Sequence, residues 1–314
     1  MRLRLSAAGL ALVLVFAFVA SVAAKTPRST HTVRKRAMKP AVSTAISRDP
    51  YIGAIVVDAA TGRVILEDGA DSKGYPASVT KLMDLLIVLE KVRQGTIKLT
   101  DKVKVTDESV GTGGSQAYLK KNESFTVDDL LYALMVKSAN DAAVALAIHV
   151  AGSKESFVQL MNRKAQELGM TSTSFCSVNG LPPRRGQTPD VSTARDLTLL
   201  ARAVLKHPDT LRYTSTKSCT FRNGSFAMSN HNHLLGVVDG CDGLKTGFFS
   251  NAGFSIVATA QRNNSRVIAV VLGSRHRRTR DLKAKGLLAQ GFQELPMPPV
   301  QLSGAMVSGQ LVIK

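Results

Sequence analysis

Three short segments of this chain carry side chains that could together perform acyl transfer. They are Ser78-Val79-Thr80-Lys81, Ser138-Ala139-Asn140 and Lys245-Thr246-Gly247. In the first segment, the hydroxyl of Ser78 at the start of a predicted helix lies beside unpaired backbone N–H groups. Lys81, three residues later, lies on the same face of that helix as Ser78. Burial, the positive end of the helix dipole and a second nearby lysine would each lower the pKa of Lys81. We therefore predict Ser78 as the nucleophile and Lys81 as its general base.

The second segment lies between predicted helices over residues 126–135 and 141–150. There Ser138 could pass a proton between Lys81 and a leaving amine, and Asn140 could hold both a substrate carbonyl and the lysine. Asn140 could also cap the following helix. The two roles of Asn140 are compatible, and the sequence leaves both open.

The third segment precedes two predicted strands. A lysine on an edge strand can offer positive charge to a carboxylate, Thr246 can donate a hydrogen bond to it, and Gly247 leaves room for a close backbone approach. Each segment alone is common, because Ser-x-x-Lys also arises from a helix cap followed by an exposed lysine. All three in this order along one chain indicate acyl transfer.

Hydrophobic periodicity predicts the elements that must position these side chains. A hairpin is predicted over residues 52–66, helices over 78–92, 126–135, 141–150, 157–168, 192–205 and 281–292, and strands over 253–259 and 266–272. Thr126 and Asp129 are spaced as a capping box. The arginines at 275, 277, 278 and 280 are interpreted as a solvated surface. Strands at both ends around a helical middle predict an α+β fold with one sheet built from distant segments.

The N-terminal residues predict export. Arg2 and Arg4 precede an uncharged run of 20 residues, from Leu5 to Ala24, which ends on small residues suited to cleavage. Residues 1–24 are therefore interpreted as a secretory signal peptide. The alternative is an uncleaved anchor, because such a run is long enough to span a bilayer. Either way we expect the protein in the periplasm or on the cell-wall side of the cytoplasmic membrane.

Charge and composition limit the partners. Residues 25–50 are basic and lack apolar periodicity, which predicts a flexible linker. The chain of 314 residues has a net charge of +18 and 5% aromatic residues. A polyanionic partner is favoured, but the basic residues are spread along the chain and stacking platforms are few, so nucleic acid is not predicted. An anionic membrane surface or cell-wall polymer remains as a partner. The oligomeric state is not predicted.

The cysteines carry little information. Cys176, Cys219 and Cys241 are an odd number, which permits one disulfide or none. None of them has another cysteine or a histidine at the spacing of a metal site. We expect neither a metal nor a cofactor, because the predicted chemistry needs none.

With these motifs the chain resembles the serine-type D-Ala-D-Ala carboxypeptidases, the low-molecular-mass penicillin-binding proteins, from about residue 51 to residue 292. The supporting stretches are 76–83, 138–143, 192–197 and 242–247. The resemblance implies a β-lactamase/transpeptidase-like α+β fold, with a five-stranded antiparallel sheet, helices on both faces and a helical subdomain. It implies a catalytic domain over residues 51–292 and a C-terminal tail over 293–314.

The resemblance also implies a reaction. The penultimate D-Ala of a peptidoglycan stem peptide would acylate Ser78, and water would hydrolyse the acyl-enzyme. β-Lactams imitate that substrate and trap the acyl-enzyme. The oxyanion hole would use the backbone N–H groups of Ser78 and Phe248. Asn140, Lys245, Thr246 and Gly247 would bind the substrate.

The chain differs from the family pattern in two places, and one of them bears on the type of peptidase activity expected. Family carboxypeptidases often carry an arginine in an Asn-x-Asn segment, where this chain has His231. A histidine is mostly neutral at pH 7, so endopeptidase cleavage of D-Ala cross-links becomes an alternative to carboxypeptidase action. The 22 residues after Phe292 are also too few for the C-terminal β domain and amphipathic helix of many relatives, and we expect neither.

Two further functions are less well supported by the sequence than a peptidase. A serine β-lactamase generally needs a Glu-x-x-Leu-Asn segment, and the nearest stretch, Val158 to Asn162, lacks the glutamate. A non-catalytic wall-binding homologue would not need the intact serine and lysines. The sequence therefore favours a serine DD-peptidase.

Overall fold

The computed structural model describes residues 51–183 and 185–295, together with the backbone of residues 305–307 and 310–312. The predicted signal peptide, the predicted linker and most of the predicted tail lie outside the described residues. Within the tail, β10 (Ala305–Val307) and β11 (Gln310–Val312) pair with each other in antiparallel orientation.

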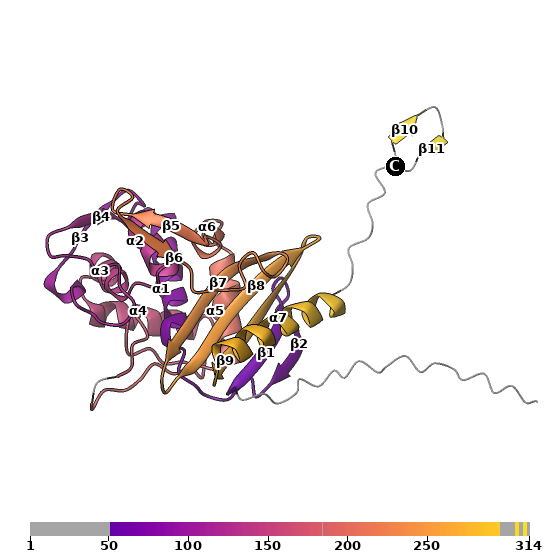
Figure 1. Cartoon of the computed structure of the whole chain (residues 1–314), viewed down its shortest axis with the longest axis horizontal. Helices are drawn as coiled ribbons and strands as arrows, with labels where there is room; N and C mark the ends of the chain where they lie inside the picture. Colours follow the sequence, from indigo (N-terminus) through magenta and orange to yellow (C-terminus); the bar gives the residue numbers. More distant parts are fainter. Residues whose placement is uncertain (1–50, 184, 296–304, 308–309, 313–314) are drawn as a thin grey trace, which may run out of the picture. The chain divides into compact units, whose positions relative to one another are not determined.

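One antiparallel sheet has the strand order β2-β1-β9-β8-β7 (Figure 1). Its strands are β1 (Gly53–Asp58), β2 (Val64–Asp68), β7 (Cys241–Phe249), β8 (Gly253–Arg262) and β9 (Ser265–Ser274). Strand β1 pairs with β9, from Gly53 opposite Leu272 to Asp58 opposite Val267. The sheet therefore joins the start of the described chain to its last strands, as the sequence predicted, and β7 lies at one edge.

Helices and short hairpins fill the chain between β2 and β7 and follow β9. The helices are α1 (Lys81–Arg93), α2 (Val127–Met135), α3 (Asn140–Ala151), α4 (Lys154–Glu167), α5 (Ala194–Leu205), α6 (Thr210–Thr214) and α7 (Arg277–Glu294). The short strands are β3 (Lys102–Lys104), β4 (Ser124–Thr126), β5 (Ser218–Phe221) and β6 (Phe226–Ser229), and the 3₁₀ turns are η1 (Ala77–Thr80) and η2 (Asp107–Ser109).

Both faces of the sheet are covered because successive strand residues point to opposite sides. On one face, Val56 packs in a cluster with Leu288 of α7. On the other face, Ile55 belongs to the larger core that contains α1, α2, α3 and α5. This arrangement, with α7 alone across one face in Figure 1, is the fold class that the motifs predicted.

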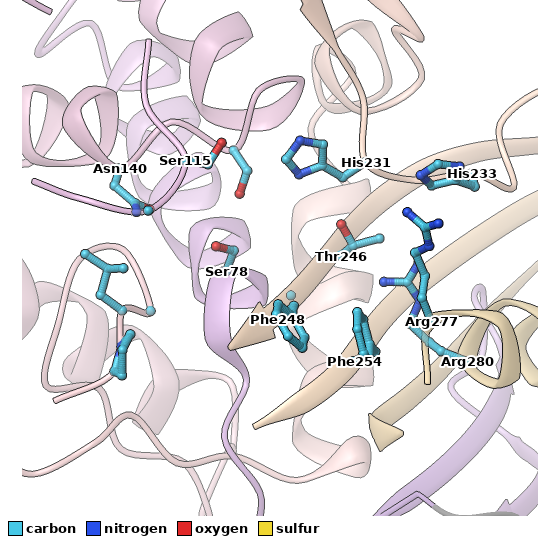
Figure 2. Close-up of a pocket in the computed structure, with 16 residues that line it drawn as sticks. Ser78, Ser115, Asn140, His231, His233, Thr246, Phe248, Phe254, Arg277 and Arg280 are labelled. Carbon is cyan, nitrogen blue, oxygen red and sulfur yellow. The ribbon is translucent and has the colours of Figure 1, made fainter. Parts of the chain in front are cut away.

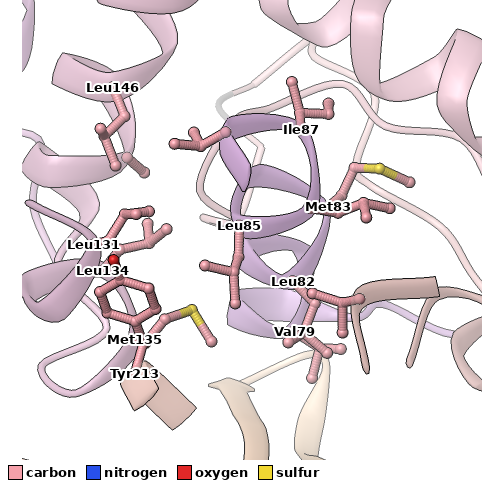
Figure 3. Packing of buried hydrophobic residues seen from close by; sticks show 14 of the residues in the cluster. Val79, Leu82, Met83, Leu85, Ile87, Leu131, Leu134, Met135, Leu146 and Tyr213 are labelled. Carbon is pink, nitrogen blue, oxygen red and sulfur yellow. The ribbon is translucent and has the colours of Figure 1, made fainter. Parts of the chain in front are cut away.

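Helix α1 is the centre of the larger core. Its residues from Lys81 to Leu89 are all buried, and all of them except Lys81 and Asp84 are apolar, as expected of a core helix. Figure 3 shows Leu85 facing Leu131 and Met135 of α2 and Tyr213 of α6. The base predicted from the sequence, Lys81, is therefore held on an element with packing on all sides.

Several predicted boundaries are wrong for local reasons. The helix predicted from Ser78 begins at Lys81, because Ala77 has a left-handed φ of 49° and residues 77–80 form a 3₁₀ turn. Strands β8 and β9 are longer than predicted, because their pairing continues to Arg262 opposite Ser265. Asn263 and Asn264, with φ of 45° and 64°, make the tight turn there. The capping box of Thr126 and Asp129 is confirmed.

Candidate active site

Ser78 lies in the turn η1, where the chain leaves the sheet region and enters α1. Its side chain faces a cavity of about 440 Å³. Figure 2 shows Ser115 and Asn140 on one side of Ser78, and Thr246 and Phe248 of the edge strand β7 on the other. The cavity therefore lies between the helical part of the molecule and the edge of the sheet.

The amine of Lys81 contacts three oxygen atoms. Its Nζ lies 3.0 Å from Ser78 Oγ, 2.7 Å from Asn140 Oδ1 and 2.5 Å from the carbonyl oxygen of Asn179. The lysine side chain is fully buried. The carbonyl of Asn179 and the Oδ1 of Asn140 can only accept hydrogen bonds, whereas the serine hydroxyl can accept or donate.

The same three partners can hold the lysine in either protonation state, because an ammonium donates to all three oxygen atoms and loses one of these donors when it becomes a neutral amine. A neutral amine has two N–H groups and one lone pair, and the two obligate acceptors use both N–H groups. The lone pair is then left for the hydroxyl of Ser78, which can donate to it. With the lysine neutral, this geometry would allow Ser78 Oγ to pass its proton to Lys81 Nζ.

Asn140 is oriented by its backbone surroundings. Its Nδ2 donates to the carbonyl of Gly113 at 2.8 Å, and its backbone N–H donates to the carbonyl of Ser115 at 2.8 Å. With one Nδ2 hydrogen donated to Gly113, the Oδ1 atom faces Lys81 and the second Nδ2 hydrogen is left for another acceptor. The alternative role as a helix cap is wrong: Ala139 is the N-cap of α3, and no side chain caps that helix.

Burial sets the electrostatics of Lys81. It lowers the pKa of Lys81 to about 8, while the nearby carboxyl groups of Asp84, Asp190 and Asp141 act in the opposite direction. Asp84 is itself buried, neither of its carboxyl oxygens has a hydrogen-bond partner among the described residues, and burial raises its pKa well above the usual value. The desolvation of a charged ammonium therefore outweighs its carboxyl neighbours.

Ser138 reaches the same cavity from the short connection between α2 and α3. Its backbone is left-handed, with φ of 60°, and the residue is buried, with 3% of its surface exposed. It lines the cavity together with Ser78 and Asn140. Such a strained backbone at a cavity wall is typical of functional sites.

The edge strand β7 approaches η1 closely. A Cβ on Gly247 would lie 2.4 Å from the carbonyl oxygen of Pro76 and 3.1 Å from the backbone nitrogen of Ser78, so only glycine fits. Lys245 is 2% exposed, and its Nζ donates to the carbonyl of Thr246 at 2.9 Å. Burial, and then the charges of Lys81 and Arg280, hold the pKa of Lys245 well below its usual value.

Aromatic and histidine side chains form the part of the cavity beyond Thr246. Phe248 is 52% exposed and stacks on Phe254, with ring centroids 4.1 Å apart. His231 lines the same cavity with part of its surface exposed, and desolvation followed by the charge of Lys245 lowers its pKa to about 4. His231 is therefore neutral at pH 7 and offers no fixed positive charge to a substrate carboxylate.

Arginines supply positive charge at this end. Of the run interpreted as a solvated surface, Arg275, Arg277 and Arg278 are exposed as expected, and Arg280 is buried. Arg277 and Arg280 both line the cavity (Figure 2). Arg280 is only 2% exposed and pairs with Asp281 at 2.6 Å. The sequence could not indicate this, because a run of arginines at a helix start gives no sign of which one turns inward.

Asn179 and Gly180 were also missed from the sequence. Asn179 supplies the carbonyl that accepts from Lys81, and Gly180 has φ of +73°. A Cβ on Gly180 would lie 2.0 Å from the carbonyl oxygen of Ala77. An Asn-Gly pair marks a turn, so the turn could have been found, but not its contact with the lysine.

Among the described residues, no group of three or more His, Cys, Asp or Glu side chains could hold a metal ion. Within the same ranges no helix has both the length and the apolar character to cross a membrane. Cys176, Cys219 and Cys241 are all free thiols.

Several known proteins are similar to this chain in sequence or in fold. The family model described as D-alanyl-D-alanine carboxypeptidase matches residues 45–276. The D-alanyl-D-alanine carboxypeptidase DacC of Escherichia coli is 39% identical over 246 residues, covering 76% of this chain and 60% of that protein. DacF of Bacillus subtilis is 34% identical over 250 residues, covering 79% and 63%. The chain thus spans about three fifths of the length of these two relatives.

A third relative matches over nearly its whole length. The D-alanyl-D-alanine endopeptidase of Escherichia coli is 30% identical over 310 residues, covering 96% of this chain and 93% of that protein. Among solved structures, penicillin binding protein 6B from Escherichia coli is 33% identical with a TM-score of 0.73, covering 80% of each chain. Penicillin-binding protein D2 from Listeria monocytogenes, in its ampicillin-bound form, is 33% identical with a TM-score of 0.71, covering 79% of this chain and 99% of that one.

The family match covers most of the described domain, and the solved relatives share its fold at over 30% identity. The three sequence motifs meet in one cavity at the edge of the same sheet. The chain belongs to the D-alanyl-D-alanine carboxypeptidase family.

Proposed function

We propose that this protein is an exported serine DD-peptidase that acts on peptidoglycan stem peptides through an acyl-enzyme, with D-Ala-D-Ala carboxypeptidase as its main activity. The observation that carries the proposal is the 3.0 Å contact between Lys81 Nζ and Ser78 Oγ, with both remaining donors of the amine engaged elsewhere. Family membership supports the substrate class.

In the acylation step, Ser78 Oγ attacks the carbonyl carbon of the penultimate D-Ala and gives its proton to Lys81. The backbone N–H groups of Ser78 and Phe248 stabilise the oxyanion. The proton then passes through Ser138 to the nitrogen of the departing D-Ala, and the C–N bond breaks. Water next attacks the ester, again with Lys81 as the base, and releases the shortened peptide.

Substrate binding uses both sides of the cavity. Asn140 donates to the peptide on the helical side, and Thr246 with Lys245 holds the terminal carboxylate on the strand side. The cations Arg277 and Arg280 lie at the same end of the cavity and favour an anionic leaving residue. β-Lactams carry an acyl carbon and a carboxylate in a similar arrangement, so we expect them to acylate Ser78. A relative with bound ampicillin supports this.

The acylation rate should depend on the protonation of Lys81. Below its pKa of about 8 the group is an ammonium and cannot accept a proton. We therefore expect the labelling rate with a fluorescent penicillin to rise about tenfold per pH unit on the acidic side and to level off above the pKa. Stopped-time labelling from acidic to alkaline pH measures this. A rate that does not change with pH would count against Lys81 as the base.

Endopeptidase action is a second candidate, and two observations favour it. The endopeptidase relative aligns over almost the full length of both chains. In the Asn-x-Asn segment this chain has His231, which is neutral at pH 7. The family resemblance would place a positively charged arginine there in many carboxypeptidases. A cross-linked peptide, in which the leaving residue belongs to a second stem, needs less specific recognition of a free carboxylate.

A comparison of two substrates separates these activities. Purified protein is given a monomeric stem pentapeptide and a cross-linked stem dimer in parallel, and the products are resolved by mass. Free D-Ala from the pentapeptide supports the main proposal, whereas monomers from the dimer support the endopeptidase. The Ser78→Ala variant is the control for both reactions. If neither substrate is cleaved, the DD-peptidase proposal fails.

A further inference from the structure

Asn140 owes its orientation to a cavity wall that has no regular secondary structure. This wall loop (residues 113–119) forms neither helix nor strand. Its Gly113 carbonyl accepts from Asn140 Nδ2, and its Ser115 carbonyl accepts from the Asn140 backbone N–H, both at 2.8 Å. Ser115 Oγ also donates to the carbonyl of Lys137 at 2.6 Å. A shift of the wall loop would therefore alter two of the hydrogen bonds that orient Asn140 toward Lys81.

Two charged side chains hold the wall loop from opposite edges of its backbone. The buried carboxylate of Asp141 accepts from the N–H groups of Ala117 and Leu119, at 3.0 and 2.9 Å. On the carbonyl side, Arg222 Nη1 donates to Ala117 at 2.6 Å and Nη2 donates to Tyr118 at 2.7 Å. Arg222 comes from the β5–β6 hairpin, about a hundred residues further along the chain.

Arg222 is itself fixed in place. It forms a two-point ion pair with Glu123, at 2.7 Å from Nη2 and 3.2 Å from Nε. Its guanidinium lies 5.4 Å from the ring centroid of Phe125 and 5.3 Å from that of Phe221, and these rings stack at 4.6 Å. The pKa of Glu123 is lowered, first by its hydrogen bond from Arg222. Such a planar fork cannot be reproduced by lysine.

We propose that Arg222 is a positioning residue for the acyl transfer: it holds the carbonyls of Ala117 and Tyr118, and so keeps the wall loop and Asn140 aligned with the Lys81 amine. The inference rests on the proposed function, because it requires Ser78 to be acylated. Arg222 is not among the residues that line the cavity. Its effect passes through the wall loop alone.

The chain offers a matched control in Arg212. This arginine of α6 pairs with Asp128 at 2.6 Å and lies 5.5 and 5.2 Å from the ring centroids of Tyr132 and Tyr213. The chemistry is thus the same, an arginine paired with a carboxylate over two aromatic rings. Among the described residues these contacts of Arg212 are with Asp128, Tyr132 and Tyr213, none of which belongs to the wall loop, so its loss should cost stability without misaligning Asn140.

The test measures acylation by a fluorescent penicillin, with the rate constant separated from the reversible affinity by varying the penicillin concentration. We expect Arg222→Met to lower the acylation rate constant by about 10- to 100-fold, because small displacements of a positioning group cost that much. Arg222→Lys, which keeps the charge but loses the fork, should lie between. Arg212→Met should acylate at the wild-type rate while unfolding at a similarly reduced temperature.

A double-mutant cycle asks whether the effect passes through Asn140. In an Asn140→Ala background, Arg222→Met should have little further effect on the acylation rate constant, since the group that it positions is gone. Equal rate losses in both backgrounds would overturn the inference. Should Arg222→Met fail to fold, Arg222→Lys is carried through the same cycle.

The results distinguish failure of the proposed function from failure of the inference about Arg222. If the wild-type protein is not labelled, the proposed function fails and the inference falls with it. If the wild type is labelled and Arg222→Met is labelled at the same rate, the inference alone fails. If Arg212→Met loses as much acylation rate as Arg222→Met, the role of Arg222 is general stability and the inference is overturned.

Discussion

Replacing Ser78 with alanine is expected to abolish covalent labelling by a fluorescent penicillin, with at least about a 10³-fold loss of rate. The hydroxyl is the atom that would form the ester, and it lies 3.0 Å from the amine of Lys81. Alanine leaves the cavity open and removes the nucleophile. Gel fluorescence after denaturation, followed by mass spectrometry of the labelled peptide, measures the adduct.

The control for this result is Ser72→Ala, which changes an exposed serine in the loop before η1 and should keep full labelling. An adduct that persists in Ser78→Ala would show that another residue is the nucleophile. Wild-type adduct that is released within seconds would indicate a serine β-lactamase. A wild-type protein without any adduct would indicate the non-catalytic wall-binding homologue.

Replacing Lys81 with methionine should lower the acylation rate by about 10²- to 10⁴-fold. Methionine approximates the length of the side chain but supplies no base for the proton of Ser78. The residual rate should also lose its dependence on a group with a pKa of about 8, since that group is Lys81. The rate is measured across pH as for the wild type, and folding is checked by circular dichroism.

Lys91→Met provides the comparison on the same helix. Lys91 lies near the end of α1, and its Nζ contacts Gln94 at 3.4 Å on the surface. This variant should acylate at the wild-type rate with the wild-type pH profile. The role of Lys81 as base would be contradicted if Lys81→Met kept either the rate or the pH profile.

Much of the fold could be predicted because its signals are local. The apolar periodicity after Ser78 located α1, and Thr126 with Asp129 located the start of α2. The start of α1 was misplaced by three residues because Ala77 has a left-handed backbone, which no property of alanine foretells. The tight approach of Gly247 to the serine likewise depends on two segments far apart in the chain.

The candidate site likewise contains residues that the sequence could identify and residues that it could not. Ser78 and Lys81 could be paired from the sequence because one helical turn brings them together, whatever the rest of the chain does. The carbonyl of Asn179 and the buried Arg280 could not be found in that way. A backbone carbonyl has no residue type to recognise, and burial of one arginine among several is decided by packing.

By itself, the sequence determined which groups are the candidates for the chemistry: a serine and a lysine one turn apart, an Asn segment and a Lys-Thr-Gly strand, with apolar patterns that make helices and a sheet. Only the tertiary structure decided the state of those groups. Burial of Lys81 lowers its pKa, the wall loop turns Asn140 Oδ1 toward it, and the edge of the sheet closes the cavity. The reason is physical, since desolvation and orientation come from atoms that are distant in the chain and adjacent in space.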